Sequence, residues 1–251
     1  MSRGTRRTLF LAAAVVVGGG LIWAFVGLPR SGQYHGVYGL TMQHVALHQR
    51  HATDLVSALT FDYRGFDTLG EEFILFVSAT GCALLLRTQR NEHSVERAVE
   101  RADARSEEVA GPLRAFGAAL VAPVLVLGGY VVAHGHLTPG GGFQGGVILA
   151  AAFVLVFVAG QLLALRRVRP MAIVELAEAI GAAGYVLIAI GGLIFGVAAL
   201  YNFLPLGTTG DLLSAGMIPV LNVSVGVEVA GAFTLVVSEF LDQALLRGAR
   251  S

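Results

Sequence analysis

The stretch VVAHGHLTPGGGFQGGVILAA, residues 131–151, decides how the chain folds, because it places a polar, glycine-rich cluster between two long apolar runs. Pro139 cannot continue a helix. Gly140, Gly141 and Gly142 allow close approaches and backbone conformations that side chains forbid. The stretch therefore predicts a tight structural corner between an apolar helix that ends near residue 133 and another that begins near residue 143.

The surrounding sequence is too apolar for one soluble core. Its 251 residues are 55% hydrophobic, and the mean hydropathy is +0.71. A helix needs roughly 20 apolar residues to cross about 30 Å of hydrocarbon. Six runs meet or approach that length, at residues 8–28, 72–86, 113–133, 143–165, 172–200 and 217–240. We therefore expect an all-α membrane protein with about six transmembrane helices.

Charge and cysteine content exclude several classes of protein. The formal net charge is zero and all 17 basic residues are arginines, so the chain has neither a basic nucleic-acid footprint nor an acidic tail. The single cysteine, Cys82, lies in an apolar run and behaves as a small hydrophobe. Intramolecular disulfides and multi-cysteine metal or iron–sulfur sites are excluded. The expected surroundings are the lipid bilayer and other membrane subunits.

Arginine placement predicts the orientation of the spans. Six alternating spans place fourteen of the 17 arginines on one side and leave Arg30, Arg50 and Arg64 on the other. By the positive-inside rule, the arginine-rich side is cytoplasmic, so both termini are predicted to be cytoplasmic in a multi-pass protein of the cell membrane. The first span is expected to be a retained anchor, because it is long and no small-residue cleavage site follows it.

The spans divide the chain into two predicted modules. Residues 1–90 hold two spans and a long external segment at residues 29–71. Residues 91–112 are dense in Arg and Glu at three- and four-residue spacings, which is typical of a solvated cytoplasmic helix or linker. Residues 113–246 form a four-span module, so the boundary is predicted at the charged linker.

The external segment contains three histidines at helical spacing. His44, His48 and His51 would share one face of a helix that lies along the membrane surface. Three imidazoles could bind zinc or copper with an open fourth position, as a membrane metalloenzyme requires. No nearby cysteine or well-spaced carboxylate completes such a set. We favour a polar, proton-buffering face and expect neither a metal nor a cofactor.

The sequence FDYRGFDTLGEE, which ends at Glu72, gathers charges just before the second span. Arg64 can pair with Asp62 or Asp67. Asp67 can also cap the span, with Glu71 or Glu72 in its first turn. Structural capping is one interpretation. The other treats four of these residues as candidates for an ion or proton path: Asp62, Arg64, Asp67 and Glu71.

Carboxyl groups are also predicted inside the apolar spans. Glu228 lies about ten residues, or roughly 15 Å, from the start of the sixth span and hence near the bilayer centre. A charge there costs at least about 2.5–3.5 kcal/mol, so Glu228 must be protonated, paired or in contact with water. Glu178 lies deeper in the fifth span than Glu175 and shares a face with it. These two serve either an ion path or contacts to helices and arginines.

The corner that follows the third span also has two interpretations. In the first, its glycines and Pro139 serve only the turn and close helix packing. In the second, exposed backbone groups and polar side chains line a wet cavity where an ion or proton enters. The candidate side chains are His134, His136, Thr138 and Gln144.

Two motifs bear a resemblance to a known family. FDYRGFDTLGE resembles the signature near the C-terminal end of the large subunit of Mrp-type (Mnh-type) multisubunit sodium/proton antiporters, and of the corresponding small subunit in membrane-bound hydrogenases. HGHLTPGGGFQGG is similar to the signature of the MnhB/MrpB domain, the next subunit in those complexes. The resemblance covers about residues 54–86 and 113–245, in the order in which the family arranges them.

The resemblance implies membership of a large membrane assembly that exchanges cytoplasmic Na⁺, or another monovalent cation, for external protons. It implies a four-span B-type domain fused to a piece of the large subunit, without that subunit's lysine and glutamate machinery. The chain would therefore need partner subunits, and no enzymatic activity of its own is expected.

Two functional hypotheses stay open at this point. In the first, carboxylates and histidines at the spans carry or support ion movement. In the second, the chain is a structural subunit that ties ion-translocating partners together in an antiporter, a hydrogenase or another redox-linked complex.

Overall fold

The computed structural model describes residues 3–28, 36–86, 111–168 and 171–248. Within those ranges every regular element is a helix, and six helices are long and apolar enough to cross a membrane. The predicted fold class, an all-α membrane protein with six spans, is confirmed.

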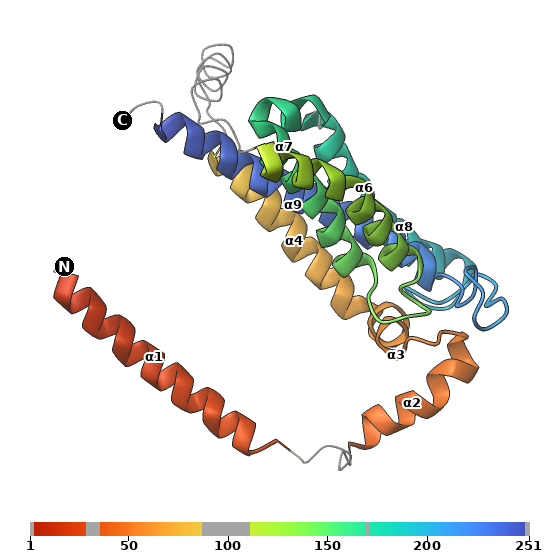
Figure 1. The fold of residues 1–251 in the computed structure, drawn as a ribbon. Coiled ribbons are helices and arrows are strands. Elements are labelled where there is room, and N and C mark those ends of the chain that lie inside the picture. Colours follow the sequence, from red (N-terminus) through yellow and green to blue (C-terminus); the bar gives the residue numbers. More distant parts are fainter. Residues whose placement is uncertain (1–2, 29–35, 87–110, 169–170, 249–251) are drawn as a thin grey trace. The chain divides into compact units, whose positions relative to one another are not determined.

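Five of these helices form a bundle around the last one. They are α4 (Gly65–Leu86), α6 (Gly111–Ala133), α7 (Gly142–Val168), α8 (Met171–Phe195) and α9 (Ile218–Gly248). Helix α9 contacts each of the other four, which run alongside it (Figure 1). Its apolar span is 56% buried, against 33% or less in the other spans, so α9 is the core of the bundle.

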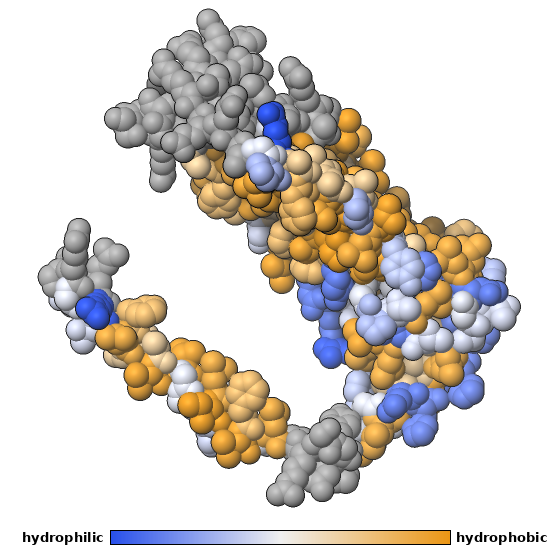
Figure 2. Space-filling view, viewed as in Figure 1, coloured by the Kyte–Doolittle hydropathy of each residue, from blue (hydrophilic) through white to orange (hydrophobic). Residues whose placement is uncertain are grey.

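Helix α1 (Arg3–Val26) belongs to a separate compact unit, residues 1–41, and is considered by itself. None of its span is buried, and the apolar side chains of Val16 and Trp23 are 74% and 83% exposed. The outside of the bundle is also apolar, and Figure 2 shows such residues over most of the visible helix surface. Surfaces of this kind are stable against lipid or an apolar partner helix.

Glycines bring α8 and α9 into backbone contact at two levels. A Cβ atom added to Gly181 of α8 would lie 2.6 Å from the Cβ of Glu228 on α9. A Cβ added to Gly231 of α9 would lie 2.7 Å from the backbone nitrogen of Glu178 on α8. Each glycine therefore stands opposite a glutamate of the other helix. Small residues at these positions let the two backbones approach as transmembrane helices require for close packing.

A layer of short segments closes one end of the bundle. It comprises α3 (Leu55–Ala58), the single-turn π-helix η1 (Leu59–Tyr63), and the loops at residues 134–141 and 196–217. We refer to these segments as the loop layer and to the adjoining end of the bundle as the loop end. Helix α2 (Val37–Arg50) precedes the layer in the chain.

Hydrogen bonds join the segments of the loop layer. The backbone N–H of Asp54 donates to the carbonyl oxygen of His136 at 3.1 Å. The side-chain amide of Asn202 donates to a carboxylate oxygen of Asp62 at 2.9 Å. The FDYRGFD motif, the HGHLTPGGG motif and the loop before α9 are thus held together, although they lie far apart in the sequence.

Two predicted helix ends differ from the structure. The second span was expected to begin at Glu72, but α4 begins at Gly65, because η1 leads almost directly into it. Glu72 therefore lies two turns inside the helix rather than in its first turn. The fifth span was expected to continue to residue 200, whereas α8 ends at Phe195, before Gly196.

The predicted division into modules stays a prediction. Its charged linker, residues 91–112, lies outside the described residues except for the last two, which begin α6. Helix α4 of the first predicted module packs against α9 of the second, and both belong to the compact unit of residues 42–251. The predicted helix in the external segment is confirmed as α2.

We expect Gly181→Ala to destabilise the protein, because its methyl group would collide with the backbone of α9 at Glu228. Overpacking of this kind costs about 1–3 kcal/mol. In Gly129→Ala the same methyl group meets no atom within 4 Å, so that variant should match or exceed the wild type in stability. Thermal unfolding of detergent-purified protein measures both, and equal melting temperatures for the two variants would contradict the assignment of this contact.

Candidate functional site

Three glutamates from three different helices are buried in the bundle. Glu72 of α4, Glu178 of α8 and Glu228 of α9 are only 4%, 2% and 0% exposed. Both carboxylate oxygens of Glu228 lack a hydrogen-bond partner, and so does one oxygen each of Glu72 and Glu178. Buried carboxyl groups are normally satisfied, so three with free oxygen atoms indicate a site rather than a structural network.

The three carboxyl groups form a chain through the bundle. The carboxyl group of Glu72 interacts with that of Glu228, and Glu178 lies within electrostatic range of Glu228. At 1.5 Å per residue, Glu72 and Glu228 lie roughly 10 and 15 Å inside the loop end of their helices, and Glu178 lies roughly 25 Å inside it. Glu228 is therefore the middle member.

No arginine neutralises this carboxyl chain among the described residues. The ion pairs found there join Arg50 to Asp62 at 2.7 Å and Arg64 to Asp67, all of them close to the loop end. Two adjacent ionised carboxylates repel each other, and hydrocarbon disfavours either charge. The Glu72–Glu228 pair is consequently stable only when it holds a proton or another cation.

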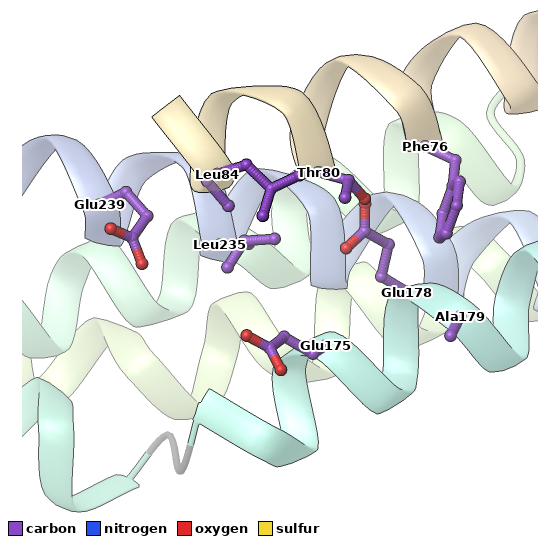
Figure 3. Close-up of a pocket in the computed structure, with 9 residues that line it drawn as sticks. Phe76, Thr80, Leu84, Glu175, Glu178, Ala179, Leu235 and Glu239 are labelled. Atoms are coloured by element: carbon purple, nitrogen blue, oxygen red, sulfur yellow. The ribbon is translucent and has the colours of Figure 1, made fainter. Parts of the chain in front are cut away.

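A cavity of about 410 Å³ lies beside Glu178, between α4, α8 and α9. Carboxyl groups of Glu175, Glu178 and Glu239 project into it from α8 and α9, next to Thr80 of α4 (Figure 3). Glu175 is exposed, whereas Glu239 is 9% exposed. We refer to this space as the acidic cavity; it gives Glu178 access to the end of the bundle opposite the loop layer.

A second cavity, of about 330 Å³, lies at the loop end beside Glu72. Its wall combines the two sequence motifs: Thr68, Glu71 and Glu72 from α4, and residues 140–144 from the corner before α7. Residues of α3 and η1 complete the wall. We refer to it as the loop-end cavity. The exposed side chains of Glu71 and Gln144 lie on this cavity, so these two sequence candidates are brought together.

The predicted corner is built as a turn with two glycines at positive φ. Gly140 and Gly141 have φ angles of +139° and +130°, which only glycine adopts readily. The corner then locks onto α9, because the backbone N–H of Gly142 donates to the side-chain oxygen of Asn222 at 2.8 Å. Pro139 is exposed in the turn that precedes these glycines.

The two histidines of the corner contact backbone carbonyls of the loop layer or helix end. Nε2 of His136, which is fully buried, lies 3.3 Å from the carbonyl oxygen of Asp211. Nδ1 of His134 lies 3.1 Å from the carbonyl oxygen of Tyr130, and its ring stacks on that tyrosine. Neither histidine lines the acidic cavity or the loop-end cavity.

The remaining charges of the FDYRGFD motif hold the loop layer together. The side chain of Asp62 is 6% exposed and pairs with Arg50, which the sequence did not predict, as well as with Asn202. Arg64 pairs with Asp67, one of the two partners predicted for it, and both side chains are exposed. Within the structure these groups belong to surface and loop packing rather than to the carboxyl chain.

The expected histidine face is incomplete. His44 and His48 lie on α2, but α2 ends at Arg50, and His51 has a φ angle of +54°. Nδ1 of His51 lies 2.7 Å from the carbonyl oxygen of Gly207 in the loop layer. The prediction that all three share one helical face is therefore wrong, and no metal-binding group of three such ligands occurs in the described parts of the chain.

Sequence reasoning missed Glu72 as a member of the buried carboxyl chain. It placed Glu72 at the start of the second span and selected Glu71 as the candidate. An earlier helix start would have turned Glu72 inward, since Thr68, four residues before it, is also buried. Tyr185 of α8 was missed as well; its buried hydroxyl donates to the carbonyl oxygen of Gly65 at 2.9 Å.

Fold and site together define a multi-pass α-helical membrane protein with an unpaired carboxyl chain between two cavities. The family described as "Domain related to MnhB subunit of Na+/H+ antiporter" matches residues 112–235. An uncharacterised protein of Methanocaldococcus jannaschii is 31% identical over 192 residues, which are 69% of this chain and 71% of that protein. A probable K(+)/H(+) antiporter component of the A/B type from Rhizobium meliloti is 32% identical over 123 residues, 43% of this chain but 12% of that protein.

Two solved complexes contain chains of similar structure. One is the membrane-bound sulfane sulfur reductase, an archaeal respiratory membrane complex; the TM-score is 0.72 at 28% identity, and the match covers 94% of this chain and 98% of that one. The other is the Mrp complex from Dietzia sp. DQ12-45-1b, with a TM-score of 0.69 at 23% identity, covering 95% of this chain and 26% of that one. The second likeness shows the fold alone.

The chain belongs to the MnhB-related family and is an MnhB-like relative of the Mrp/Mnh-type antiporter components. The resemblance inferred from the two motifs is thereby confirmed. Homology supports a place within an antiporter-type membrane complex, with other subunits of the complex as its partners.

Burial lowers the pKa of His136 from its ordinary value of 6.5, against the opposing effect of the hydrogen bond to the Asp211 carbonyl. The unfolded chain then binds a proton more readily than the folded one, so His136 stabilises the fold fully above pH 6.5 and loses this contribution as the pH falls through the folded-state pKa.

We therefore expect the melting temperature of the wild type to fall more between about pH 7 and pH 5 than that of His136→Gln. Thermal unfolding across this range in detergent measures the difference. His48→Gln, a change at an exposed position of α2, should follow the wild type. Parallel pH profiles for wild type and His136→Gln would show that His136 makes no such contribution.

Proposed function

We propose that this chain is a subunit of a monovalent cation/proton antiporter of the cell membrane, that Na⁺ is the cation exchanged, and that the chain contributes a proton path of its own. The observation that carries the proposal is Glu228, which is fully buried with both carboxylate oxygens unpartnered. The names of the matched family and of the Rhizobium relative support the antiporter role.

The geometry provides a route for protons through the bundle. A proton from the loop-end cavity binds Glu72, which lines that cavity, and passes to the adjacent carboxylate of Glu228. Protonated Glu228 returns to the carboxylate state when its proton reaches Glu178, through water or by side-chain rotation. Glu178 releases the proton into the acidic cavity. Each transfer moves one proton between two carboxyl groups, so no charge accumulates in the apolar interior.

The direction of this route follows from the arginine pattern. Positive-inside asymmetry places the loop end outside the cell and the acidic cavity towards the cytoplasm. External protons would then move inwards as the complex exports Na⁺. The chain acts in transport and not as an enzyme, and its exposed apolar helices provide surface for partner subunits.

A structural role is the second candidate. The reductase complex contains a chain that matches 98% of its own length to this one, so the same fold also serves a redox-linked assembly. In that case the chain would join partner subunits of an antiporter, a hydrogenase or a related complex, and ions would cross elsewhere.

We expect Glu228→Gln to reduce antiport at least about tenfold while the complex stays intact, since the amide fills the same volume but cannot exchange a proton. Cation-dependent proton movement across inverted membrane vesicles measures transport, and size-exclusion chromatography measures assembly. Asp211→Asn makes the same chemical change at an exposed loop position and should transport normally. Wild-type transport by Glu228→Gln, or loss of transport only through disassembly, would favour the structural role.

A further inference from the structure

We propose that the loop-end cavity is a binding site for a monovalent metal cation, with Glu72 as its charged ligand and nearby hydroxyl and amide oxygens as its neutral ligands. This inference deepens the proposed function and rests on it for the view that the bound cation is the transported one. It is carried by the hydrogen-bonding state of the atoms around the cavity.

The hydroxyl groups on the cavity wall have already used their hydrogens. Ser57 donates to the carbonyl oxygen of Gly135 at 2.5 Å, and Thr68 donates to the carbonyl oxygen of Thr60 at 2.8 Å. Thr60 itself donates to the carbonyl oxygen of Val56 at 2.9 Å. A hydroxyl has one hydrogen and two lone pairs, so these three groups offer only lone pairs to a ligand.

Backbone donors near the cavity are also occupied. The N–H of Gly142 donates to Asn222, and the N–H of Gly145 donates to the carbonyl oxygen of Gly141 at 2.9 Å. Together with the negative charges of Glu71 and Glu72, this leaves a wall that disfavours an anion. Oxygen ligands without sulfur or imidazole nitrogen are those that hard cations prefer.

Glu72 supplies a negative charge inside the cavity wall. It is 4% exposed, and its Oε2 atom has no hydrogen-bond partner. One buried carboxylate with neutral oxygens suits a single positive charge, whereas Ca²⁺ and Mg²⁺ sites use several carboxylates or a complete octahedral shell. The volume of about 330 Å³ leaves room for a cation that keeps some of its water.

Gly141 keeps this space open. A Cβ atom at this position would lie 3.6 Å from the amide oxygen of Gln144 and 3.8 Å from the hydroxyl oxygen of Ser57. It would also come within 2.8 Å of the side-chain oxygen of Asn222. A side chain at residue 141 would thus enter the region that the oxygen atoms surround, and the positive φ angle independently favours glycine there.

The cation and the transported proton compete for Glu72. Titratable groups near Glu72 are Glu228 of α9, Tyr185 of α8 and Glu71 of its own helix, and Glu178 of α8 follows beyond Glu228. Helix α7 and the loop layer contribute only uncharged groups to the cavity: Ser57, Thr60 and Gln144. A cation on Glu72 therefore displaces the proton held between Glu72 and Glu228, as exchange of the two ions requires.

Binding of ²²Na⁺ to the purified complex tests the site. We expect Glu72→Gln and Thr68→Val each to weaken Na⁺ binding by about tenfold, because each removes one oxygen ligand at nearly constant volume. Thr138→Val is the matched control: Thr138 lies in the same corner but lines neither cavity, so its affinity for Na⁺ should be that of the wild type. Wild-type affinity should fall as the pH is lowered.

Gln144→Ala keeps the inference testable if the buried variants fail to assemble, since Gln144 is exposed and its loss should not unfold the chain. It should also weaken Na⁺ binding. Unchanged affinity in Gln144→Ala and in any assembled Glu72→Gln or Thr68→Val would overturn the cation site, and loss of transport in Glu228→Gln would still uphold the proposed function. Glu72-dependent Na⁺ binding with normal transport in Glu228→Gln would uphold the cation site and overturn the proton path.

Discussion

The contact between α8 and α9 is the constraint on which the buried site depends. Gly181 stands against Glu228, and Gly231 stands against Glu178, so each carboxyl group leaves its helix where the partner helix has no side chain. Without hydrophobic attraction between helices in lipid, close packing has to come from such small residues. The same contact that stabilises the bundle therefore also places two acids on one seam and keeps lipid away from both.

The loop layer extends this arrangement to α4. Asn222 of α9 accepts a hydrogen bond from Gly142, and its own amide group donates to the carbonyl oxygen of Ile218 at 3.1 Å. The corner before α7 is thus fixed to the central helix, while Asp54 and Ser57 bind its backbone from the other side. Two motifs that lie far apart in the sequence consequently form the wall of one cavity with Glu72 at its base.

Hydropathy and glycine chemistry were sufficient to predict the six helices, the corner and the depth of Glu228. Each of these depends on local sequence and the thickness of a bilayer. The choice between Glu71 and Glu72 depended instead on where α4 begins, and a π-helical turn shifted that start to Gly65. The pairing of Asp62 with Arg50 depended on how a loop folds back, which periodicity does not encode. His51 left its predicted face for the same reason: tertiary contacts end α2 at Arg50.

The hydroxyl of Tyr185 links two helices that bear different members of the carboxyl chain. It donates to the carbonyl oxygen of Gly65, where η1 passes into α4, and so connects the loop-end part of α8 to the first turn below Glu72. A sliding or rotation of α8 must either break this bond or move the start of α4 with it. The phenol thus works as a mechanical linkage: rearrangement of a neighbouring protein that packs on α8 would reach the wall of the opposite cavity within one rigid element.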